Sequence, residues 1–136
     1  AQKCAEILWQ RDKATQALGM QLISVSAGSA KLEMVVHADM INGHGTCHGG
    51  FIFTLADSAF AFACNTYDER TVAQHAQVSF IAPALSGDSL IAHAVERSRT
   101  GRSGIYDITV TLEDGKQIAE FRGLSRTIGG SIVESS

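Results

Sequence analysis

The sequence has little proline, little charge and no long hydrophobic run. Its one proline, Pro83, argues against a proline-rich linker, and the chain contains no repeat or low-complexity tract. Charged residues make up 18% of the chain, the net charge is −3, and the basic residues are scattered, whereas a nucleic-acid footprint needs clustered Lys and Arg. The most apolar stretch is interrupted by Asp57 and is shorter than the ~20 residues of a membrane span. We therefore expect neither nucleic acid nor a membrane as a partner.

Cysteine is also scarce. Cys4, Cys47 and Cys64 are an odd number at irregular spacings, so they predict no disulfide framework and fit a reducing compartment. The first residues, AQKCAEILWQRDKATQAL, lack the long apolar segment of a secretory signal. We expect a cytoplasmic protein.

The rest of the composition is globular. The chain has 136 residues, of which 45% are hydrophobic, and this predicts one domain over residues 1–136 with one core. Hydrophobic periodicity predicts helices over residues 2–17 and 48–65, a loop over 38–47, and six strands over 20–26, 30–37, 71–81, 88–98, 104–113 and 116–128. The segments SAGS and Asp114-Gly115 are turn signals, so each predicts a hairpin.

The helix over residues 48–65 carries apolar side chains on nearly every face: Phe51, Ile52, Phe53, Leu55, Phe60 and Phe62. A helix of this kind is expected to be buried. The strands lack alternating crossover helices, which favours an antiparallel sheet. The predicted fold class is therefore α+β, with a strongly curved antiparallel sheet wrapped around one long helix.

The start of this helix carries a motif, NGHGTCHGGFIFTLAD, over residues 42–57. An asparagine stands six residues before a His-Gly-Gly, and an aspartate stands eight residues after its first glycine: Asn42-Gly43-His44, His48-Gly49-Gly50 and Leu55-Ala56-Asp57. With GIYDI, FRG and Gly129-Gly130 further on, the chain resembles the hotdog-fold acyl-CoA thioesterases over nearly its whole length. It is most similar to the branch found in bacterial phenylacetic acid degradation.

The resemblance implies a function and an assembly. The expected reaction is hydrolysis of acyl-CoA thioesters, with aryl-acetyl or hydroxylated phenylacetyl-CoA as substrate and without a cofactor. The expected assembly is a homodimer, paired into a homotetramer, with sites shared between subunits. An alternative from another class is a non-catalytic hotdog module that binds acyl-CoA. A hydratase or dehydratase shares the fold, but we find no motif for it here.

Gly49 and Gly50 stand at the predicted helix start. The first N–H groups of a helix have no intrahelical partner and carry partial positive charge, and glycine lets a ligand approach closely. We interpret these residues as an oxyanion site for the thioester carbonyl. The alternative is that both glycines serve the packing of helix against sheet.

Asp57 is a lone carboxylate on an apolar helix, which is costly to bury unless it is paired or used. It could instead be exposed, paired with an arginine or capped by Thr54. The resemblance places the catalytic acid at this position. Asp57 would act as general base on water, or as nucleophile to give an anhydride, and the sequence does not separate the two.

The spacing of these two residues has a geometric consequence. Gly49 and Asp57 lie eight residues apart on one helix, hence roughly 12 Å apart at 1.5 Å per residue. Donors and base must act within about 3 Å of the reacting atoms. Either one of them is not catalytic, or two helices meet antiparallel in a two-fold dimer. Asn42 would then orient the water or bind the thioester oxygen.

The segment HGTCH resembles a metal site, but a loop containing Gly45 does not hold His44 and His48 on one helical face. No further Cys/His pair follows at a ligand spacing, so we expect no metal. We assign His48 to the catalytic set as a helix-entry residue that is hydrogen-bonded within the site. A Cys47–His48 catalytic pair is an alternative, although adjacent side chains usually point apart.

Two further positions are candidates for substrate binding. Many relatives carry Ser or Thr on the strand after the buried helix, where this chain has VAQHAQVSF, and we assign Gln74 to that place. Phosphates of coenzyme A are commonly met by Arg and backbone N–H groups, which the turn RSRTGRSG, residues 97–104, supplies. The resemblance carries over Arg102, with Arg97 and Arg99 as weaker candidates. A solvated hairpin is the competing interpretation.

Overall fold

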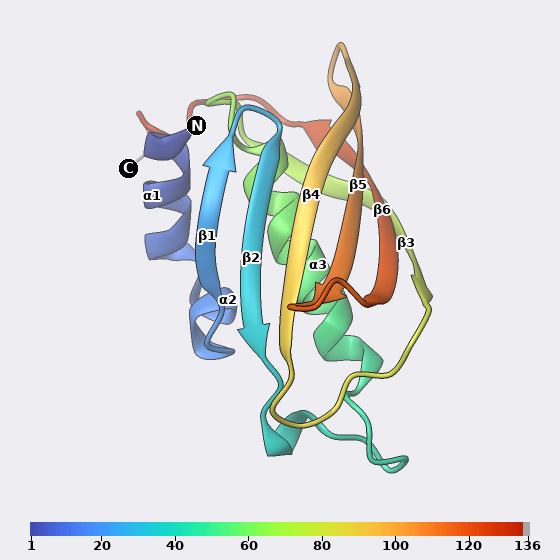
Figure 1. Ribbon diagram of the computed structural model, residues 1–136. Coiled ribbons are helices and arrows are strands. Elements are labelled where there is room, and N and C mark those ends of the chain that lie inside the picture. Colours follow the sequence, from blue (N-terminus) through green and yellow to red (C-terminus); the bar gives the residue numbers. More distant parts are fainter. Residues whose placement is uncertain (135–136) are drawn as a thin grey trace.

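A curved sheet partly encloses one long helix in the computed structural model, which describes residues 1–134 (Figure 1). The sheet is antiparallel and six-stranded in the order β1-β2-β4-β5-β6-β3. The strands are β1 Gln21–Ser26, β2 Ser29–Val35, β3 Thr71–Phe80, β4 Ser89–Thr100, β5 Ser103–Leu112 and β6 Gln117–Thr127, and the helix is α3 Gly49–Cys64. The predicted α+β architecture, a curved antiparallel sheet around a long helix, is confirmed.

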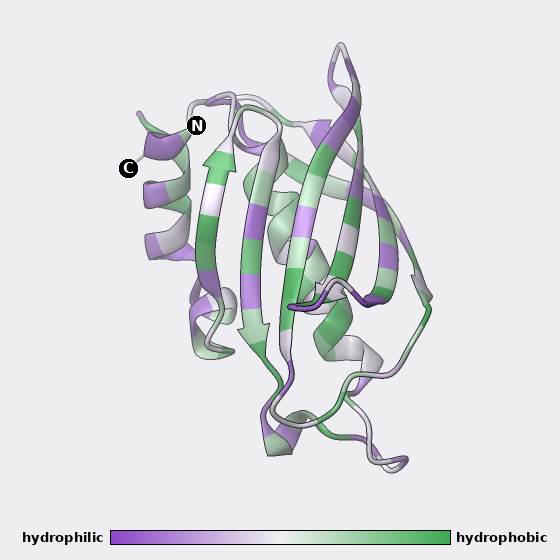
Figure 2. Cartoon of the chain, viewed as in Figure 1, coloured by the Kyte–Doolittle hydropathy of each residue, from purple (hydrophilic) through white to green (hydrophobic). Residues whose placement is uncertain are grey.

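The core lies between the concave face of the sheet and the inner face of α3. Side chains alternate between buried and exposed along β2 and β4, which Figure 2 shows as alternating apolar and polar bands. This alternation places one face of the sheet on the core and the other in solvent. On α3, the inner face is fully buried and includes Ile52, Leu55, Ala56, Ala59 and Phe60.

The outer face of α3 is only half-buried, which corrects the expectation of burial on all sides. Its partly exposed residues recur at helical spacing: Phe53, Thr54, Asp57 and Ala61. The sheet wraps the other side of the helix and does not reach this stripe. One chain therefore leaves an open stripe along its central helix.

The N-terminal segment forms two helices, α1 Gln2–Arg11 and α2 Lys13–Ala17, instead of the single helix predicted over residues 2–17. The break is at Asp12, which leaves helical geometry (φ −86°, ψ 82°) and caps α2 by accepting a hydrogen bond from the Thr15 N–H. Aspartate is among the best capping residues because its oxygen satisfies an otherwise unpaired N–H. α1 lies beside β1, and its Trp9 ring approaches Phe62 of α3 at 6.3 Å between centroids (Figure 1).

β3 is an edge strand and is largely exposed. It pairs with β6 on one side only, and a bulge at Gln74 interrupts the register between Ala73 and His75. Val72 and Phe80 keep 45% and 54% of their surface exposed. An unpaired edge with exposed apolar side chains is a surface on which another strand can pair.

The turns mostly follow the predicted turn signals. β1 and β2 form the hairpin expected at SAGS, and β5 and β6 form the one expected at Asp114-Gly115, where Gly115 has φ 93°. The turn expected over residues 97–104 is shorter, because β4 continues to Thr100 and only Gly101 and Arg102 form it. The loop over 38–47 begins with a short 3-10 helix, Ala38–Met40. In the described part of the chain, no helix is long and apolar enough to cross a membrane.

Gly123 on β6 is required by the packing of α3. A Cβ at this position would lie 2.6 Å from Cε2 of the fully buried Phe60 ring. We expect Gly123→Ala to lower the free energy of unfolding by about 1–3 kcal/mol, because the ring has no space into which to move. Urea unfolding of the variant against wild type measures the change.

Gly43→Ala is the matched control, because no atom lies within 4 Å of the added Cβ. It should change stability by less than about 0.5 kcal/mol. The penalty of Gly123→Ala should shrink in a Phe60→Leu background, since the two sites share one contact. An equal penalty in both backgrounds would show that the Phe60 ring is not its cause.

Candidate active site

The loop before α3 is closed by Asn42. Ile41 and Cys47 form an isolated bridge, and the Asn42 N–H donates to the Thr46 carbonyl at 2.8 Å. The Asn42 side-chain oxygen accepts hydrogen bonds from the N–H groups of His44 (2.9 Å) and Thr46 (3.2 Å). Because these donors fix the orientation of the amide, the NH₂ group of Asn42 must occupy the other side. Asn42 can therefore donate to a ligand oxygen.

His48 is the N-cap of α3. Its Nδ1 accepts the N–H of Gly50 at 2.9 Å, and its own N–H donates to the Met40 carbonyl. A neutral His48 ring therefore carries its proton on Nε2. The ring is exposed and stands at the end of α3, two turns from Asp57. His48 is therefore a hydrogen-bonded residue at the start of α3, and its place in the catalytic set stays a prediction.

The cap distinguishes the two glycines that sequence analysis treated alike. Gly50 gives its N–H to His48, so that N–H is not free to hold an oxyanion, which corrects the expectation for Gly50. No hydrogen bond of the Gly49 N–H is found among the described residues. Gly49 is the first residue of α3, where the helix dipole concentrates partial positive charge. Gly49 is therefore the available backbone donor.

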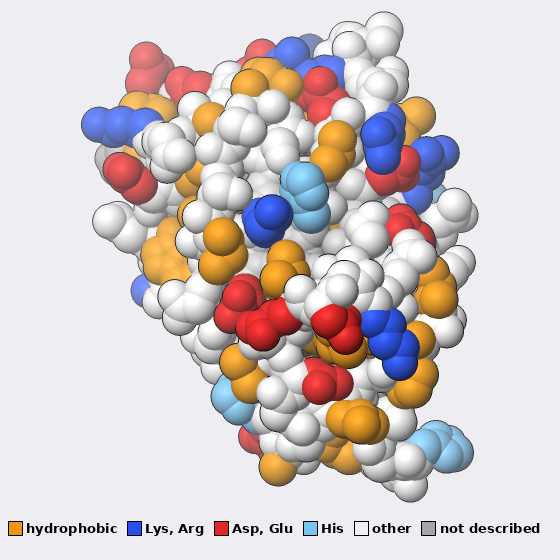
Figure 3. Space-filling model, viewed as in Figure 1, with side chains coloured by type: hydrophobic (Ala, Val, Ile, Leu, Met, Phe, Trp, Pro, Cys, Tyr) orange, Lys and Arg blue, Asp and Glu red, His pale blue; other side chains and the backbone are white. Residues whose placement is uncertain are grey.

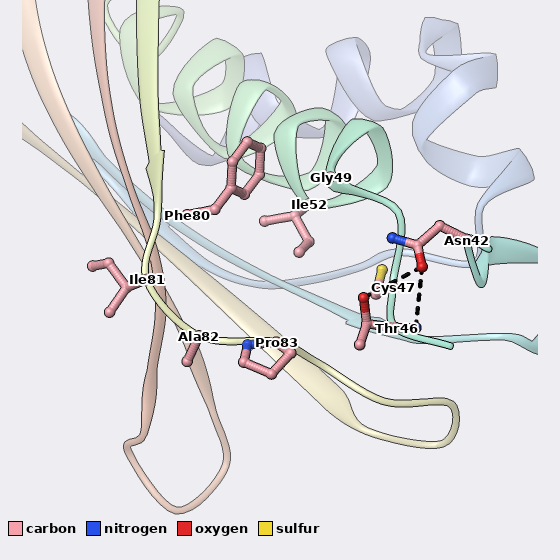
Figure 4. A pocket seen from close by; sticks show the side chains of 9 residues that line it. All are labelled: Asn42, Thr46, Cys47, Gly49, Ile52, Phe80, Ile81, Ala82 and Pro83. Carbon is pink, nitrogen blue, oxygen red and sulfur yellow. Dashed lines mark hydrogen bonds between the residues drawn. The ribbon is translucent and has the colours of Figure 1, made fainter. Parts of the chain in front are cut away.

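A pocket of about 470 Å³ opens beside this donor (Figure 4). Figure 4 shows the Phe80 ring directed toward the first turn of α3 and Ile81 directed away from it. A Cβ on Gly49 would lie 2.9 Å from the half-exposed Phe80 ring, so glycine permits this close approach and a larger residue would displace the ring. The pocket is lined by Asn42, Thr46, Cys47, Gly49, Ile52, Phe80, Ile81, Ala82 and Pro83.

Asp57 lies outside this pocket, two turns further along α3 on its half-buried outer stripe. Among the described residues, no hydrogen bond or ion pair satisfies its carboxylate. The alternative of a cap by Thr54 does not hold, because that hydroxyl donates to the Gly50 carbonyl at 2.8 Å. Burial raises the pKa of Asp57, and the nearby negative charge of Asp12 raises it further. The carboxylate is thus a stronger proton acceptor than an ordinary aspartate.

Cys47 does not form a catalytic pair with His48. Its thiol is buried and directed at the His48 carbonyl at 3.6 Å, while the His48 Nδ1 is occupied by Gly50. Burial raises the pKa of the Cys47 thiol, which disfavours the reactive thiolate. His44 and His48 are both exposed, and across residues 1–134 no group of three or more His, Cys, Asp or Glu could hold a metal ion.

The structure separates the three arginine candidates. Arg97 lies within β4 and forms an ion pair with Asp107 at 2.9 Å. Arg122 pairs with the same carboxylate at 2.6 Å. Hydrogen bonds from Arg122 and, to a smaller extent, from Arg97 lower the pKa of Asp107. Arg99 is also in β4, where it pairs with Glu69 and stacks 3.8 Å above the Tyr67 ring. These two arginines are engaged within the chain. Figure 3 shows that acidic and basic side chains are interspersed on this face.

Arg102 stands alone at the exposed tip of the β4–β5 turn. In Figure 1 this tip and the Asn42 loop lie at opposite ends of the sheet. Arg102 can therefore serve the Gly49 pocket only from another subunit. Gln74, in contrast, is exposed at the β3 bulge, a feature that often redirects a side chain at functional sites.

Sequence analysis missed two residues that the structure places at the site. Phe80 reaches Gly49 from the end of a strand, a long-range contact that no local pattern indicates. Asp12 was assigned to the interior of a helix, although its sequence position before Lys13-Ala14-Thr15 is that of an N-cap. A capping signal could have identified Asp12.

Known proteins share this fold and have similar sequences. The chain belongs to the thioesterase superfamily, whose family model matches residues 44–119, and it is a thioesterase of the hotdog fold. It is 42% identical to the acyl-coenzyme A thioesterase PaaI of Escherichia coli K12 over 95% of this chain and 92% of that protein. The solved structure of E. coli PaaI, from the phenylacetic acid degradation operon, superimposes with a TM-score of 0.93 at 41% identity over 96% of both chains. The TT0310 protein of Thermus thermophilus gives 0.83 at 38% identity over 87% of this chain and 99% of that one.

The raised pKa of Asp57 has a consequence for stability. A carboxyl whose folded-state pKa is raised stabilises the fold below its unfolded pKa, and this stabilisation is lost as the pH rises through the folded-state pKa. At neutral pH the charged Asp57 therefore costs folding free energy. We expect Asp57→Asn to have a higher Tm than wild type at pH 7, with the difference shrinking as the pH falls toward the ordinary range of a carboxyl group.

Thermal unfolding at a series of pH values measures this difference. Asp39→Asn removes the same charge from an exposed position and should change the Tm little. A lower Tm of Asp57→Asn at neutral pH would mean that the carboxylate has a favourable partner in the assembled protein.

Proposed function

We propose that this thioesterase hydrolyses acyl-CoA thioesters to the free acid and CoA, with phenylacetyl or hydroxylated phenylacetyl as the acyl group. The observation that carries the proposal is Asp57, a half-buried carboxylate of raised pKa without a partner among the described residues. Ionisable groups with a perturbed pKa that are buried at a cost in stability occur most often at functional sites. The E. coli relative PaaI supports the thioester through its name and the aryl-acetyl group through its phenylacetic acid degradation operon.

The reaction follows from the available donors and the base. The Gly49 N–H and the Asn42 NH₂ group hold the thioester oxygen, so that negative charge can develop on it. Asp57 takes a proton from water while the water oxygen bonds to the carbonyl carbon. The tetrahedral intermediate collapses with cleavage of the C–S bond, and the proton passes from Asp57 to the departing CoA thiolate. In the nucleophilic variant, the Asp57 carboxylate attacks the carbonyl carbon and the C–S bond breaks, which releases the CoA thiolate and leaves a mixed anhydride. Water then hydrolyses the anhydride, which regenerates the Asp57 carboxylate, releases the free acid and supplies the proton of the CoA thiol.

The reaction needs two subunits. Gly49 and Asp57 are fixed roughly 12 Å apart on one straight helix, beyond the reach of a common reacting carbon. Antiparallel pairing of two β3 edges would set two α3 helices side by side with their open stripes facing. A two-fold axis then brings Gly49 of one subunit to Asp57 of its partner. We propose a homodimer on this axis, paired into a homotetramer.

The walls of the pocket fit an apolar acyl group. Phe80 and Ile52 stand beside Gly49, and an aromatic ring can pack on Phe80 with a gain beyond simple burial. In this assembly Gln74 lies on the edge that pairs, and Arg102 of a neighbouring subunit meets the phosphates of CoA. Both roles are part of the proposal.

A mixing experiment tests the shared site. Asp57→Asn removes the base, and Gly49→Pro removes the donor N–H at the first helical position, where proline is tolerated and the extended His48 (ψ 132°) permits it. Each variant alone should lose about 10²–10³-fold in thiol release from phenylacetyl-CoA. Refolding an equimolar mixture should restore about a quarter of wild-type activity, because half of the dimers are mixed and each holds one intact site.

Gly49→Ala is the control for Gly49→Pro, because it adds the same Cβ against Phe80 and keeps the N–H. It should retain far more activity than the proline variant. No recovery in mixtures of folded dimers would place the whole site within one subunit. Tight binding of phenylacetyl-CoA without thiol release by wild type would instead identify a binding module.

A further inference from the structure

The break between α1 and α2 is tied to the central helix by a chain of hydrogen bonds. The Thr15 hydroxyl lies 2.6 Å from Asp12 Oδ2 and 2.8 Å from the Ser58 hydroxyl. Thr15 and Ser58 are both buried, at 1% and 9% exposure. Ser58 follows Asp57 directly on α3. The series of hydrogen bonds from Asp12 therefore ends beside the proposed base, Asp57.

The direction of this chain follows from its donors. An ionised carboxylate has no proton to give, so the Thr15 hydroxyl donates to Asp12. The Thr15 oxygen must then accept its second bond from the Ser58 hydroxyl. Asp12 Oδ1 also accepts the Thr15 N–H at 3.0 Å. Both oxygens of Asp12 are thus held, and its negative charge has a fixed position.

This charge acts on Asp57. Burial is the first cause that raises the pKa of Asp57, and the Asp12 charge is the second. The Cys64 thiol on the same helix has its pKa raised to about 12, chiefly by burial and also by the charge of Asp57. That thiol is neutral at working pH. Asp12 therefore supplies a negative charge that opposes ionisation of the Asp57 carboxyl group.

We propose that Asp12 is a positioning residue of the thioesterase site, which docks the N-terminal segment on α3 through Thr15 and Ser58 and keeps a second negative charge beside Asp57. The inference rests on the proposed role of Asp57 as the base. Repulsion by Asp12 disfavours the ionised form of Asp57 and so strengthens it as a proton acceptor. The cost is that a smaller fraction of Asp57 is ionised at low pH.

Asp12→Asn tests this role, because asparagine caps a helix as well as aspartate does but carries no charge. In the variant, the acidic limb of kcat/KM against pH should move to lower pH. The plateau should fall, because the base is weaker. The two profiles should therefore cross, with the variant severalfold faster than wild type at acidic pH and slower on the plateau. Structural damage alone would lower the rate at every pH.

Two further variants complete the design. Asp12→Ser removes the charge and keeps a capping oxygen, and it should reproduce the crossing. Glu6→Gln removes one negative charge from an exposed position on α1, and its profile should superimpose on that of wild type. If Glu6→Gln moved the acidic limb of the kcat/KM profile as far as Asp12→Asn does, the change in net charge alone would explain the effect, and the inference would be overturned.

A measurement without turnover separates this inference from the proposed function. ¹³C NMR of the Asp57 carboxyl, assigned with Asp57→Asn, should show titration at lower pH in Asp12→Asn than in wild type. Unchanged titration in a protein that still hydrolyses phenylacetyl-CoA would overturn the role of Asp12 alone. If Asp57 titrates at lower pH in Asp12→Asn than in wild type but the wild-type protein releases no thiol, the coupling of the two carboxylates is supported and the proposed function is overturned.

Discussion

The fixed spacing of residues along one straight helix constrains the rest of this protein. α3 holds Gly49 at its first position, where the helix dipole is favourable and the N–H has no acceptor within the described chain. Asp57 lies two turns later on the outer stripe of the helix. A helix does not bend to bring residues eight positions apart into contact with one carbon atom. The sheet covers only the inner face of α3, so the stripe with Asp57 stays open, and the β3 edge beside it stays unpaired. The same geometry that separates the two groups in one chain leaves exposed the surfaces that could unite them in two.

Asp57 shows how function and stability oppose each other at this site. A half-buried carboxylate with no partner among residues 1–134 costs folding free energy, and a nearby aspartate increases the cost. A protein under selection for stability alone would place an apolar or amide side chain there. The remainder of α3 offsets the cost, because its inner face is fully buried against the sheet. The helix is therefore stable on one face and reactive on the other.

The sequence predicted the fold well, because the fold depends on local patterns. Alternation along β2 and β4, the Asp114-Gly115 turn and the continuous apolar run of α3 are each visible within about a dozen residues. The motif around His48 and Asp57 identified the candidate site, and the spacing rule led to the dimer hypothesis. What failed depended on individual hydrogen bonds and distant contacts. Apolar residues recur on both sides of Asp12, so the sequence predicted one helix and placed in its interior a residue that caps the second of two helices. The Gly50 N–H is taken by a neighbouring imidazole, and Gly49 is covered by Phe80 from a strand thirty-one residues later, which no periodicity indicates.

The capping hydrogen bond of His48 also determines which groups can donate to an oxyanion in the proposed site. Because His48 accepts the Gly50 N–H, α3 offers one backbone donor to the pocket, whereas oxyanion sites of acyl transfer commonly use two donors. Asn42 is placed to supply the second, since its oxygen is committed to the loop and its NH₂ group is not. The loop hydrogen bonds that fix Asn42 thus determine which of its atoms can meet a substrate. In the proposed dimer, both donors come from one chain and are in place before the partner binds, whereas the base comes from the partner. Under that proposal, association of the subunits determines whether a bound thioester is only polarised or is also hydrolysed.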